Sequence, residues 1–201
     1  MEKFAALIQW FDTHACSPDP DDNSIEWVRC VPFVALHLVC LGVFYVGWSW
    51  FAVGVSLSLY AVRMFAITGF YHRYFSHRSF KTSRPVQFLF ALLGATAVQR
   101  GALWWASHHR HHHRHSDLKT DTHSPRQQGF WWSHVGWFAC SKNFRTDYSR
   151  VRDLTAFPEL VFLNRFDTLV PIAFAFGLFG IGWIFGQIFP ELGTNGWQLF
   201  I

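Results

Sequence analysis

Long runs of apolar residues alternate with polar stretches along this chain, and the lengths of these runs predict helices that cross a membrane. Residues 30–70 are almost wholly apolar, which is too long for one transmembrane helix of about 20 residues and suits two. The sequence GWSW at 47–50 has the glycine, serine and tryptophans of a tight turn at a membrane interface. We therefore predict a transmembrane hairpin over 30–70, with its helices at 30–47 and 51–70.

A further apolar run of span length covers residues 167–189, and the sequence PELGTNG after it is typical of a turn. Residues 197–201 begin another apolar run. Segment 167–201 is therefore predicted to hold a third transmembrane helix and the start of a truncated fourth, so that the second hairpin is incomplete. We expect this chain to be the N-terminal part of a longer protein.

The N-terminal segment 1–29 shows a helical pattern at its start. Phe4, Leu7, Ile8 and Phe11 share one face of a helix, but charged residues interrupt the run. A cleavable signal peptide would have a basic start and an uninterrupted apolar core, so this segment does not fit one. We predict a cytoplasmic or interfacial segment, whose helix either lies on the membrane or packs on the protein's own surface.

The central segment 71–166 separates the hairpin from the third apolar run, and its charge indicates its location. It holds 14 of the chain's 17 Lys and Arg residues. Because an excess of Lys and Arg marks the cytoplasmic side of a membrane protein, we predict a cytoplasmic domain here. The apolar residues 86–98 within it are too few for a span and are expected to pack under this domain or lie on the membrane surface.

Composition agrees with this organisation. Charged residues make up 15% of the chain, against about 25% in a typical soluble domain. We therefore predict an all-α, multi-pass membrane protein with transmembrane helical hairpins and a cytoplasmic helical domain. The four cysteines form no CxxC pair, which argues against a disulfide framework or a zinc ribbon. The apolar runs argue against a nucleic-acid partner.

The histidines are the candidate functional residues. The chain has twelve, and nine of them fall from His72 to His123. A first cluster is HRYFSH, in which His72 and His77 are five residues apart. On an α-helix these two would point about 140° apart, so they are not expected to chelate one ion side by side unless the helix ends between them. They would then bracket one site or serve two metals.

A second cluster, HHRHHHRH, runs from His108 to His115. His109, His112 and His113 share one face of a helix and could present three nitrogens to a metal. The set His108, His111 and His112 has the same spacing, so spacing alone does not choose between the two registers. Imidazole is a ligand that suits iron, copper, zinc and nickel.

The sequence lacks the residues that several other kinds of functional site require. None of the four glutamates is followed three positions later by histidine, which excludes a carboxylate-bridged di-iron bundle. No nucleophile elbow is present. A metal transporter would need ionisable residues along its spans, and only His37 and Arg63 lie in the apolar hairpin. Arg63 is expected to reach the interface or a polar cavity, and His37 is expected to be structural.

The three motifs HRYFSHRSFK, WWASHHRHHHRHSDLKTDTHSP and GFWWSHVGW resemble those of the membrane fatty acyl desaturases, the Δ9, stearoyl-CoA desaturase-like histidine-box family, with the bacterial branch the most similar. The resemblance covers nearly all of the chain and chooses the second register. It implies five metal ligands, which are His72, His77, His109, His112 and His113. Trp105 stands at the family's tryptophan ahead of the second box.

Residues around the boxes are also implied by the resemblance. The family's Asp-Pro-His falls on Asp121, Thr122 and His123, so a threonine replaces the usual proline. Asp117 and Asp121 are predicted to orient ligand rings from behind, and His123 is a further candidate for this supporting role. Carboxylate partners of this kind hold ligand imidazoles in place at metal sites.

The resemblance implies an O₂-dependent desaturase that introduces a cis double bond into a saturated acyl chain, with two Fe²⁺ ions held by about nine ligands, of which this chain supplies five. The substrate is an acyl-CoA or an acyl-lipid. Ser107, His108 and Arg100 depart from positions that read CoA in animal enzymes, so those contacts do not carry over. A ferredoxin or a cytochrome b5-type protein is the expected electron donor.

The implied location is the bacterial inner membrane, where the lipid bilayer surrounds the spans and the histidine boxes face the cytoplasm. Two other functions stay open from the sequence. One is a histidine-box hydroxylase, which would release an alcohol instead of an alkene. The other is a histidine-rich metal-binding or transport membrane protein without enzymatic activity.

Overall fold

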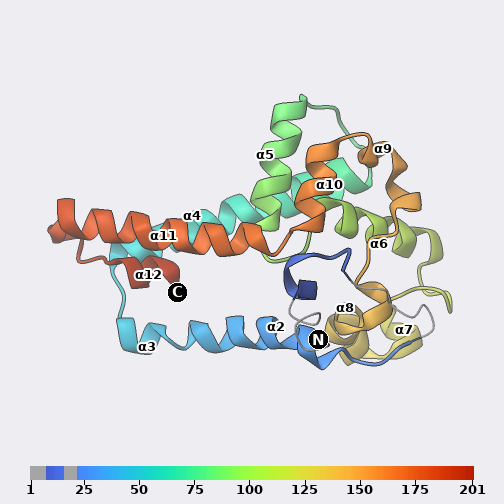
Figure 1. Cartoon of the computed structure of the whole chain (residues 1–201), viewed down its shortest axis with the longest axis horizontal. Helices are drawn as coiled ribbons and strands as arrows, with labels where there is room; N and C mark the ends of the chain where they lie inside the picture. The colour runs from blue at the N-terminus through green and yellow to red at the C-terminus, as the bar shows by residue number, and fades with distance from the viewer. Residues whose placement is uncertain (1–7, 16–21) are drawn as a thin grey trace.

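The computed structural model describes residues 8–15 and 22–201, and within these ranges the chain is helical. The only pairing of the β type among the described residues is an isolated antiparallel bridge between Ile25 and Cys140. The all-α prediction is therefore confirmed for this part of the chain. Figure 1 shows long helices at one end of an elongated molecule and shorter, variously oriented helices at the other.

Two helices of the described chain are long and apolar enough to cross a membrane. They run from Trp50 to Ser76 and from Leu169 to Ile188, and their most apolar stretches of 18 residues have mean hydropathies of 1.6 and 2.0. The first combines α4 (Trp50–Phe65) with a π-helix, η1 (Ala66–Ser76). The second is α11 (Leu169–Ile188). Both agree with predicted helices, but the first continues past residue 70 and carries His72 with it.

The other half of the predicted hairpin is interrupted. Helix α2 (Trp27–Cys40) is followed by a short α3 (Val43–Val46), and the apolar stretch Cys30–Val46 is shorter than the two candidate spans. The break falls at Gly42, where a glycine lowers helix stability by roughly 0.5–1 kcal/mol relative to alanine.

The predicted turn at 47–50 is present. Gly47 has a φ of +71°, which a residue with a side chain rarely adopts. The Ser49 hydroxyl accepts the backbone N–H of Ala52 at 3.1 Å and so caps the start of α4. The turn therefore ends one apolar helix and begins the next.

The polar end of the molecule is built around η1. Helices α5 (Arg84–Ala95) and α6 (Ala102–His115) pack against it, and α10 (Pro158–Arg165) packs against those two helices. The buried side chains of Tyr71, Phe75, Leu103, Leu154 and Leu160 form much of the core there. With 12 residues, α5 is about 18 Å long, well short of a hydrocarbon layer of about 30 Å. It stands across α4 in Figure 1.

Shorter elements connect these helices. They are α7 (Pro125–Gln128), η2 (Trp132–Gly136), α8 (Trp137–Ala139), η3 (Ser141–Asn143), η4 (Tyr148–Val151), α9 (Arg152–Thr155), η5 (Pro190–Leu192) and α12 (Gly196–Phe200). The last of these packs along α11 after the predicted turn, in which Gly193 has a φ of +60°.

The described part of the N-terminal segment is attached to the polar end. Residues 8–11 are helical, whereas Phe4 and Leu7 lie outside the described residues. Asp12 accepts two hydrogen bonds from Arg165, at 2.9 and 2.6 Å, and the Thr13 N–H donates to the Arg165 carbonyl at 3.0 Å. Residues 12 and 13 therefore pack on the protein's own surface, at the end of α10.

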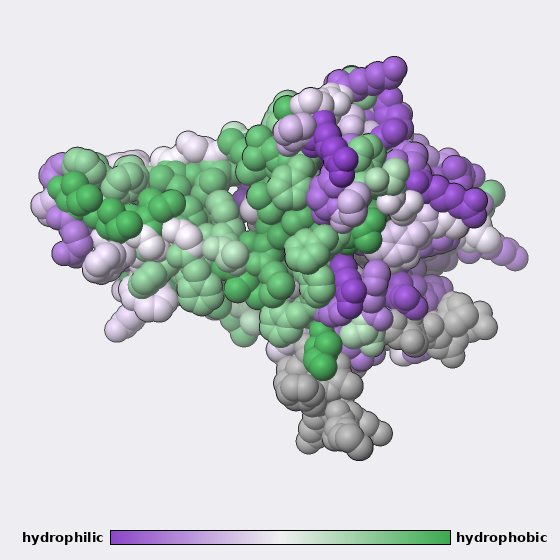
Figure 2. Space-filling model, turned by 45° about the horizontal axis from the view of Figure 1, so that its top comes forward, coloured by the Kyte–Doolittle hydropathy of each residue, from purple (hydrophilic) through white to green (hydrophobic). Residues whose placement is uncertain are grey.

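The surface divides in the same way as the elements. Figure 2 shows apolar residues covering the elongated end and polar residues gathered at the other. Large side chains such as Phe44, Trp50 and Phe176 are 88%, 78% and 65% exposed at the apolar end. An apolar surface of this extent is a site for contact with lipid or with other protein.

Candidate metal centre

The π-helix η1 brings His72 and His77 together. In a π-helix the backbone bond joins residues five apart, and here the His77 N–H donates to the His72 carbonyl at 3.1 Å. The two Nε2 atoms lie 3.1 Å apart. The divergence of about 140° expected on an α-helix therefore does not arise, because the segment is wound as a π-helix and this helix ends at Ser76, between the two histidines. Residues five apart lie on one face when the helix is wound as a π-helix.

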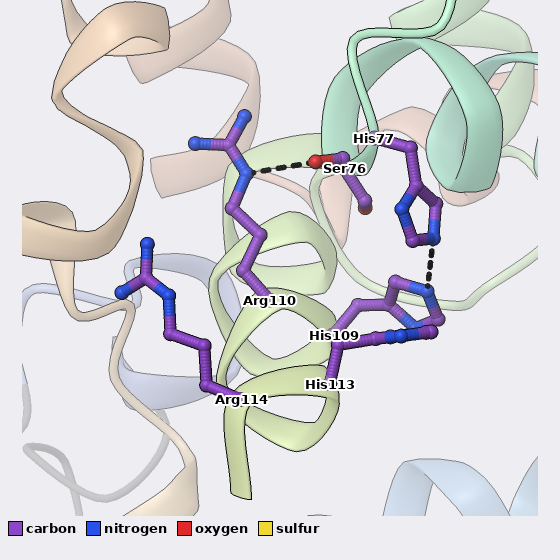
Figure 3. Close-up of a pocket in the computed structure, with 6 residues that line it drawn as sticks. All are labelled: Ser76, His77, His109, Arg110, His113 and Arg114. Atoms are coloured by element: carbon purple, nitrogen blue, oxygen red, sulfur yellow. Dashed lines mark hydrogen bonds between the residues drawn. The ribbon is translucent and has the colours of Figure 1, made fainter.

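Helix α6 presents two more imidazoles to the same point. His109 and His113 are one turn apart on this helix, and the Nε2 atom of His109 lies 3.1 Å from that of His77. One ring nitrogen from each of His72, His77, His109 and His113 falls within 4.8 Å of the others. These four residues are the first histidine group. Figure 3 shows three of them around a pocket of about 320 Å³.

Buried side chains fix where α6 begins. The Asn164 Oδ1 atom accepts the Trp104 N–H at 2.7 Å, and the Asp167 carboxylate accepts the Gly101 N–H at 3.0 Å. A Cβ at Gly101 would come within 2.6 Å of the Asn164 Cα atom, so only glycine fits here. Trp105, in the first turn, stacks on His109 with ring centroids 4.6 Å apart and an interplanar angle of 27°. These contacts set the position of α6 and the plane of the His109 ring.

A second group forms beside the first. Ligand atoms of His112, Asp121 and His123 lie within 4.8 Å of one another. The rings of His112 and His123 stack with centroids 4.2 Å apart, and the His112 and His113 centroids are 5.8 Å apart. The structure therefore divides the predicted ligand set, since His112 belongs to this second group and the two groups adjoin.

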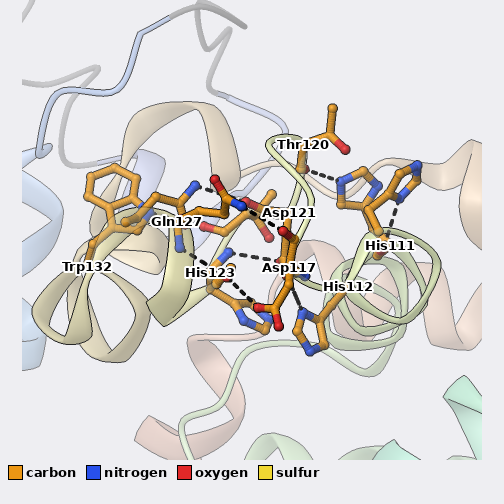
Figure 4. Close-up of polar contacts among 12 residues, drawn as sticks. His111, His112, Asp117, Thr120, Asp121, His123, Gln127 and Trp132 are labelled. Carbon is orange, nitrogen blue, oxygen red and sulfur yellow. Dashed lines mark hydrogen bonds and ion pairs between the residues drawn. The ribbon is translucent and has the colours of Figure 1, made fainter.

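Asp121 organises the second group, and Figure 4 shows it between His112 and His123. Its side chain is fully buried, and both carboxylate oxygens lie 3.0 Å from His112 Nδ1. The backbone N–H groups of Asp117 and His123 donate to it at 3.0 and 3.2 Å. Burial alone would raise the pKa of Asp121, but the hydrogen bonds from His112 and these two amides lower it. An ionised Asp121 keeps the proton on His112 Nδ1, which leaves Nε2 free to bind a metal.

Asp117 and Thr122 occupy different roles from Asp121. The Asp117 carboxylate accepts the Ser124 hydroxyl at 2.6 Å, and none of its hydrogen bonds in the described chain involves a histidine ring. Its φ of +62° makes a tight bend after α6. The Thr122 carbonyl accepts the Trp132 indole N–H at 3.1 Å, so a hydrogen bond joins this loop to the motif GFWWSHVGW.

Burial keeps the central imidazole neutral. Burial, together with the neighbouring rings of His113 and His72, lowers the pKa of His109 to about 3. Burial also lowers the pKa of His123, with His112 as the next cause. Because a metal binds only the unprotonated ring nitrogen, these two residues are available as ligands at neutral pH.

The alternative register of the second cluster is not assembled. His108 belongs to neither group and packs against Trp104 and Trp137, with centroids at 4.6 and 5.4 Å. It is 6% exposed, and neither ring nitrogen has a hydrogen-bond partner within the described part of the chain. Burial is the largest of the causes that lower its pKa to about 3. His111 instead bonds the Thr120 carbonyl at 2.8 Å.

Sequence reasoning missed Trp137, whose ring lies 4.7 Å from that of His123 and 5.4 Å from that of Trp104. It is the last residue of the motif GFWWSHVGW, and its place in that motif was the signal that could have identified it.

Two residues at the positions that read CoA in animal enzymes form contacts within the protein. Arg100 bonds Asp167 at 2.9 Å, and the Ser107 hydroxyl donates to the Asp147 carbonyl at 3.0 Å.

The donor sets fit transition metals. The first group offers four imidazole nitrogens and no carboxylate, a set that suits divalent iron, zinc, copper or nickel and disfavours magnesium or calcium. The second adds imidazoles that are supported by a buried carboxylate. Two ions held side by side are therefore compatible with the residues that the described chain brings together.

Comparison with known proteins gives a consistent result. The model of the family described as "Fatty acid desaturase" matches residues 48–201, which include both groups. An sn-1 stearoyl-lipid 9-desaturase of Anabaena variabilis is 37% identical over 165 residues, covering 80% of this chain and 60% of its own.

Two further relatives show the range of substrates. An sn-2 palmitoyl-lipid 9-desaturase of Nostoc sp. (strain 36) is 34% identical, covering 84% of this chain and 61% of its own. An acyl-CoA 5-desaturase of Anemone leveillei is 38% identical, covering 71% and 45%. The chain thus spans roughly half to three fifths of the length of these relatives.

Proposed function

Since this chain belongs to the fatty acid desaturase family, we propose that the protein introduces a cis double bond into a saturated acyl chain, with O₂ as the oxidant. The observation that carries this proposal is the pair of adjoining histidine groups at the end of a long apolar helix. We further propose that the bond forms at position 9 of an acyl-lipid. Two of the compared relatives act there, and Arg100 and Ser107 are engaged in internal contacts.

The two groups would hold two Fe²⁺ ions, the first by His72, His77, His109 and His113 and the second by His112 and His123. Iron bound there and reduced by an external donor would supply the oxidising power to break methylene C–H bonds, which no side-chain acid or base can do. The division of ligands between two neighbouring groups supports two ions better than one, because the His112 and His113 rings belong to different groups.

The protein's own residues would orient the metal ligands and position the acyl chain. Asp121 holds the proton on His112 Nδ1, and Trp105 fixes the plane of the His109 ring. Because these rings are already held in place, they need to reorganise less when a metal ion binds. The apolar helices α4 and α11 would keep the acyl chain beside the first group, so that the same two carbons face it in each turnover.

We propose a multi-pass protein with the polar end in the cytoplasm. The long apolar helices support the spans, and the concentration of Lys and Arg in 71–166 supports the orientation. That positive surface would attract an acidic electron carrier such as a ferredoxin or a cytochrome b5-type protein. Electron-transfer rates should then fall as the salt concentration rises.

Expression of the protein in a bacterial host that makes only saturated fatty acids tests the function. Lipids extracted after growth in air would be analysed by gas chromatography and mass spectrometry, and the double bond located after chemical tagging. A 9-monounsaturated chain that is absent without O₂ and in a His109→Ala variant is the expected result. Recovery of an acyl alcohol would indicate a hydroxylase instead, and no acyl product at all would contradict the proposal.

A further inference from the structure

Arg110 lies between the histidines of α6, and its side chain leaves the helix toward the end of η1 (Figure 3). We propose that Arg110 is a positioning residue that holds the π-helix against α6 and so assembles the first histidine group. The proposal rests on the proposed function only in treating that group as a metal site.

All five N–H donors of the guanidinium have acceptors. Nε donates to the Ser76 carbonyl at 3.1 Å, and one Nη2 hydrogen goes to the Phe75 carbonyl at 2.6 Å. Nη1 donates to the Arg150 carbonyl at 3.0 Å. The remaining two donors form a bidentate pair with the Asp153 carboxylate, at 2.7 and 3.0 Å. Arginine has five donors in a fixed plane, so this site uses every one of them.

The acceptors on η1 are its last two carbonyl groups. The final carbonyls of a helix have no partner within the helix, and those of Phe75 and Ser76 directly precede His77. Their bonds to Arg110 therefore fix the end of the π-helix, where the α-helical alternative would rotate His77 away from His72. On the α6 side, Arg110 directly follows His109, whose Nε2 atom meets that of His77 at 3.1 Å.

Asp153 fixes the guanidinium from a third segment, η4 and α9. The Arg110 side chain is only 15% exposed, and Asp153 also pairs with Arg78 at 3.2 Å. Arg114, one turn further along α6, lines the same pocket but is exposed and makes no hydrogen bond or ion pair with any described residue. It carries the same charge without the same bonds, and so provides a matched control.

Cobalt(II) binding to the purified full chain in detergent micelles tests this role, because cobalt(II) bound by imidazole absorbs visible light. The variants are Arg110→Lys, Arg110→Gln and the control Arg114→Gln, with His72→Ala used to identify the absorption of the first group. Lysine keeps the charge but replaces the planar fork with a point charge. Far-UV circular dichroism and the melting temperature report whether each variant is folded.

We expect the wild type and Arg114→Gln to bind two cobalt ions. Arg110→Lys and Arg110→Gln should lose the absorption of the first group, with affinity there lowered about 10–100-fold, the usual effect of removing a supporting contact. The second group, held by Asp121, should still bind its ion. A merely structural role would lower both affinities together or neither.

Asp153→Asn provides a second variant if those at Arg110 do not fold. It retains the Arg110 bonds to the three carbonyls, and a smaller loss of first-group affinity is expected. If a folded Arg110 variant binds cobalt at the first group as tightly as the wild type, the role of Arg110 is overturned but the proposed metal centre is not. If no Arg110 variant folds, the same conclusion follows from equal affinity in Asp153→Asn. Absence of cobalt binding by the wild type would instead contradict the proposed metal centre.

Discussion

The two candidate metal groups are neighbours, yet they are built in opposite ways. The first joins histidines from two helices that are more than 30 residues apart in sequence, and its four rings meet without any carboxylate. The second is local: His112, Asp121 and His123 lie within a stretch of 12 residues, and a buried carboxylate holds them. The first group therefore depends on the packing of whole helices, whereas the second depends on one side chain.

This difference indicates how each group would fail. A change in helix winding or helix docking should disassemble the first group and leave the second in place. Loss of the Asp121 hydrogen bonds should do the reverse. Metal content per group, measured separately, therefore reports which kind of support has been removed.

Replacement of His77 by alanine should have the largest effect. His77 is central to the first group, because its Nε2 atom lies 3.1 Å from those of both His72 and His109. We expect desaturase turnover in lipid extracts to fall by about 100-fold or more, at least as much as the loss of a supporting contact. The control is His115→Ala, on the same cluster but outside both groups. Turnover within a factor of two of the wild type in His77→Ala would exclude the first group as a metal site.

Asp121→Asn should come next and act on the other group. The amide oxygen still accepts a hydrogen bond from His112 Nδ1 but no longer carries the negative charge that makes Nε2 a stronger ligand, so affinity at the second group should fall about 10–100-fold. Metal analysis at limiting metal should then give about one ion per chain. Asp117→Asn is the matched control, since its carboxylate bonds Ser124 and no histidine ring in the described chain. Identical metal content in the two variants would argue that Asp121 has no special role.

A smaller effect concerns stability and pH. The pKa of buried His108 is lowered to about 3, below its usual value of 6.5. The folded state therefore binds fewer protons than the unfolded state, and stability present above about pH 6.5 is lost as the pH falls toward 3. At pH 5 this residue alone costs about 2 kcal/mol. His108→Phe should raise the melting temperature of the metal-free protein more at pH 5 than at pH 7.5. Equal gains at both pH values, or the same response in His115→Phe, would contradict this.

The smallest expected change lies in the loop of the second group. The Thr122 hydroxyl is buried and has no hydrogen-bond partner among residues 8–15 and 22–201. Thr122→Val removes this unsatisfied group and should stabilise the fold by about 1 kcal/mol, seen as a higher melting temperature. Thr155→Val serves for comparison, because the Thr155 hydroxyl donates to the Arg152 carbonyl at 2.8 Å. A lower melting temperature for Thr122→Val would show that its hydroxyl has a partner in solution.

The sequence predicted the apolar helices α4 and α11, because their lengths and compositions are sufficient to identify them, but the helix predicted at 30–47 is interrupted. Asp117 and Asp121 were both candidate partners of ligand rings, and the structure places only Asp121 of these two against a histidine ring. The sequence could not place His72 beside His77, because the choice of a π-helix is made by packing: Tyr71 is fully buried and bonds the Ala91 and Arg100 carbonyls from other segments. Nor could it separate His112 from His113, since both lie near one face of α6 and only the 117–123 loop divides them.

Because α4 continues directly into η1, one helix links the apolar end of the molecule to the first histidine group. The helix from Trp50 to Ser76 has 27 residues. The 16 residues of α4 span about 24 Å, and the 11 residues of η1 add a smaller rise per residue, so the helix is somewhat longer than a hydrocarbon layer of about 30 Å. A single continuous helix therefore sets the height of His72 above the lipid in the proposed arrangement. Acyl chains that thicken or thin the bilayer would tilt that helix, so the composition of the membrane would act back on the protein that is proposed to alter it.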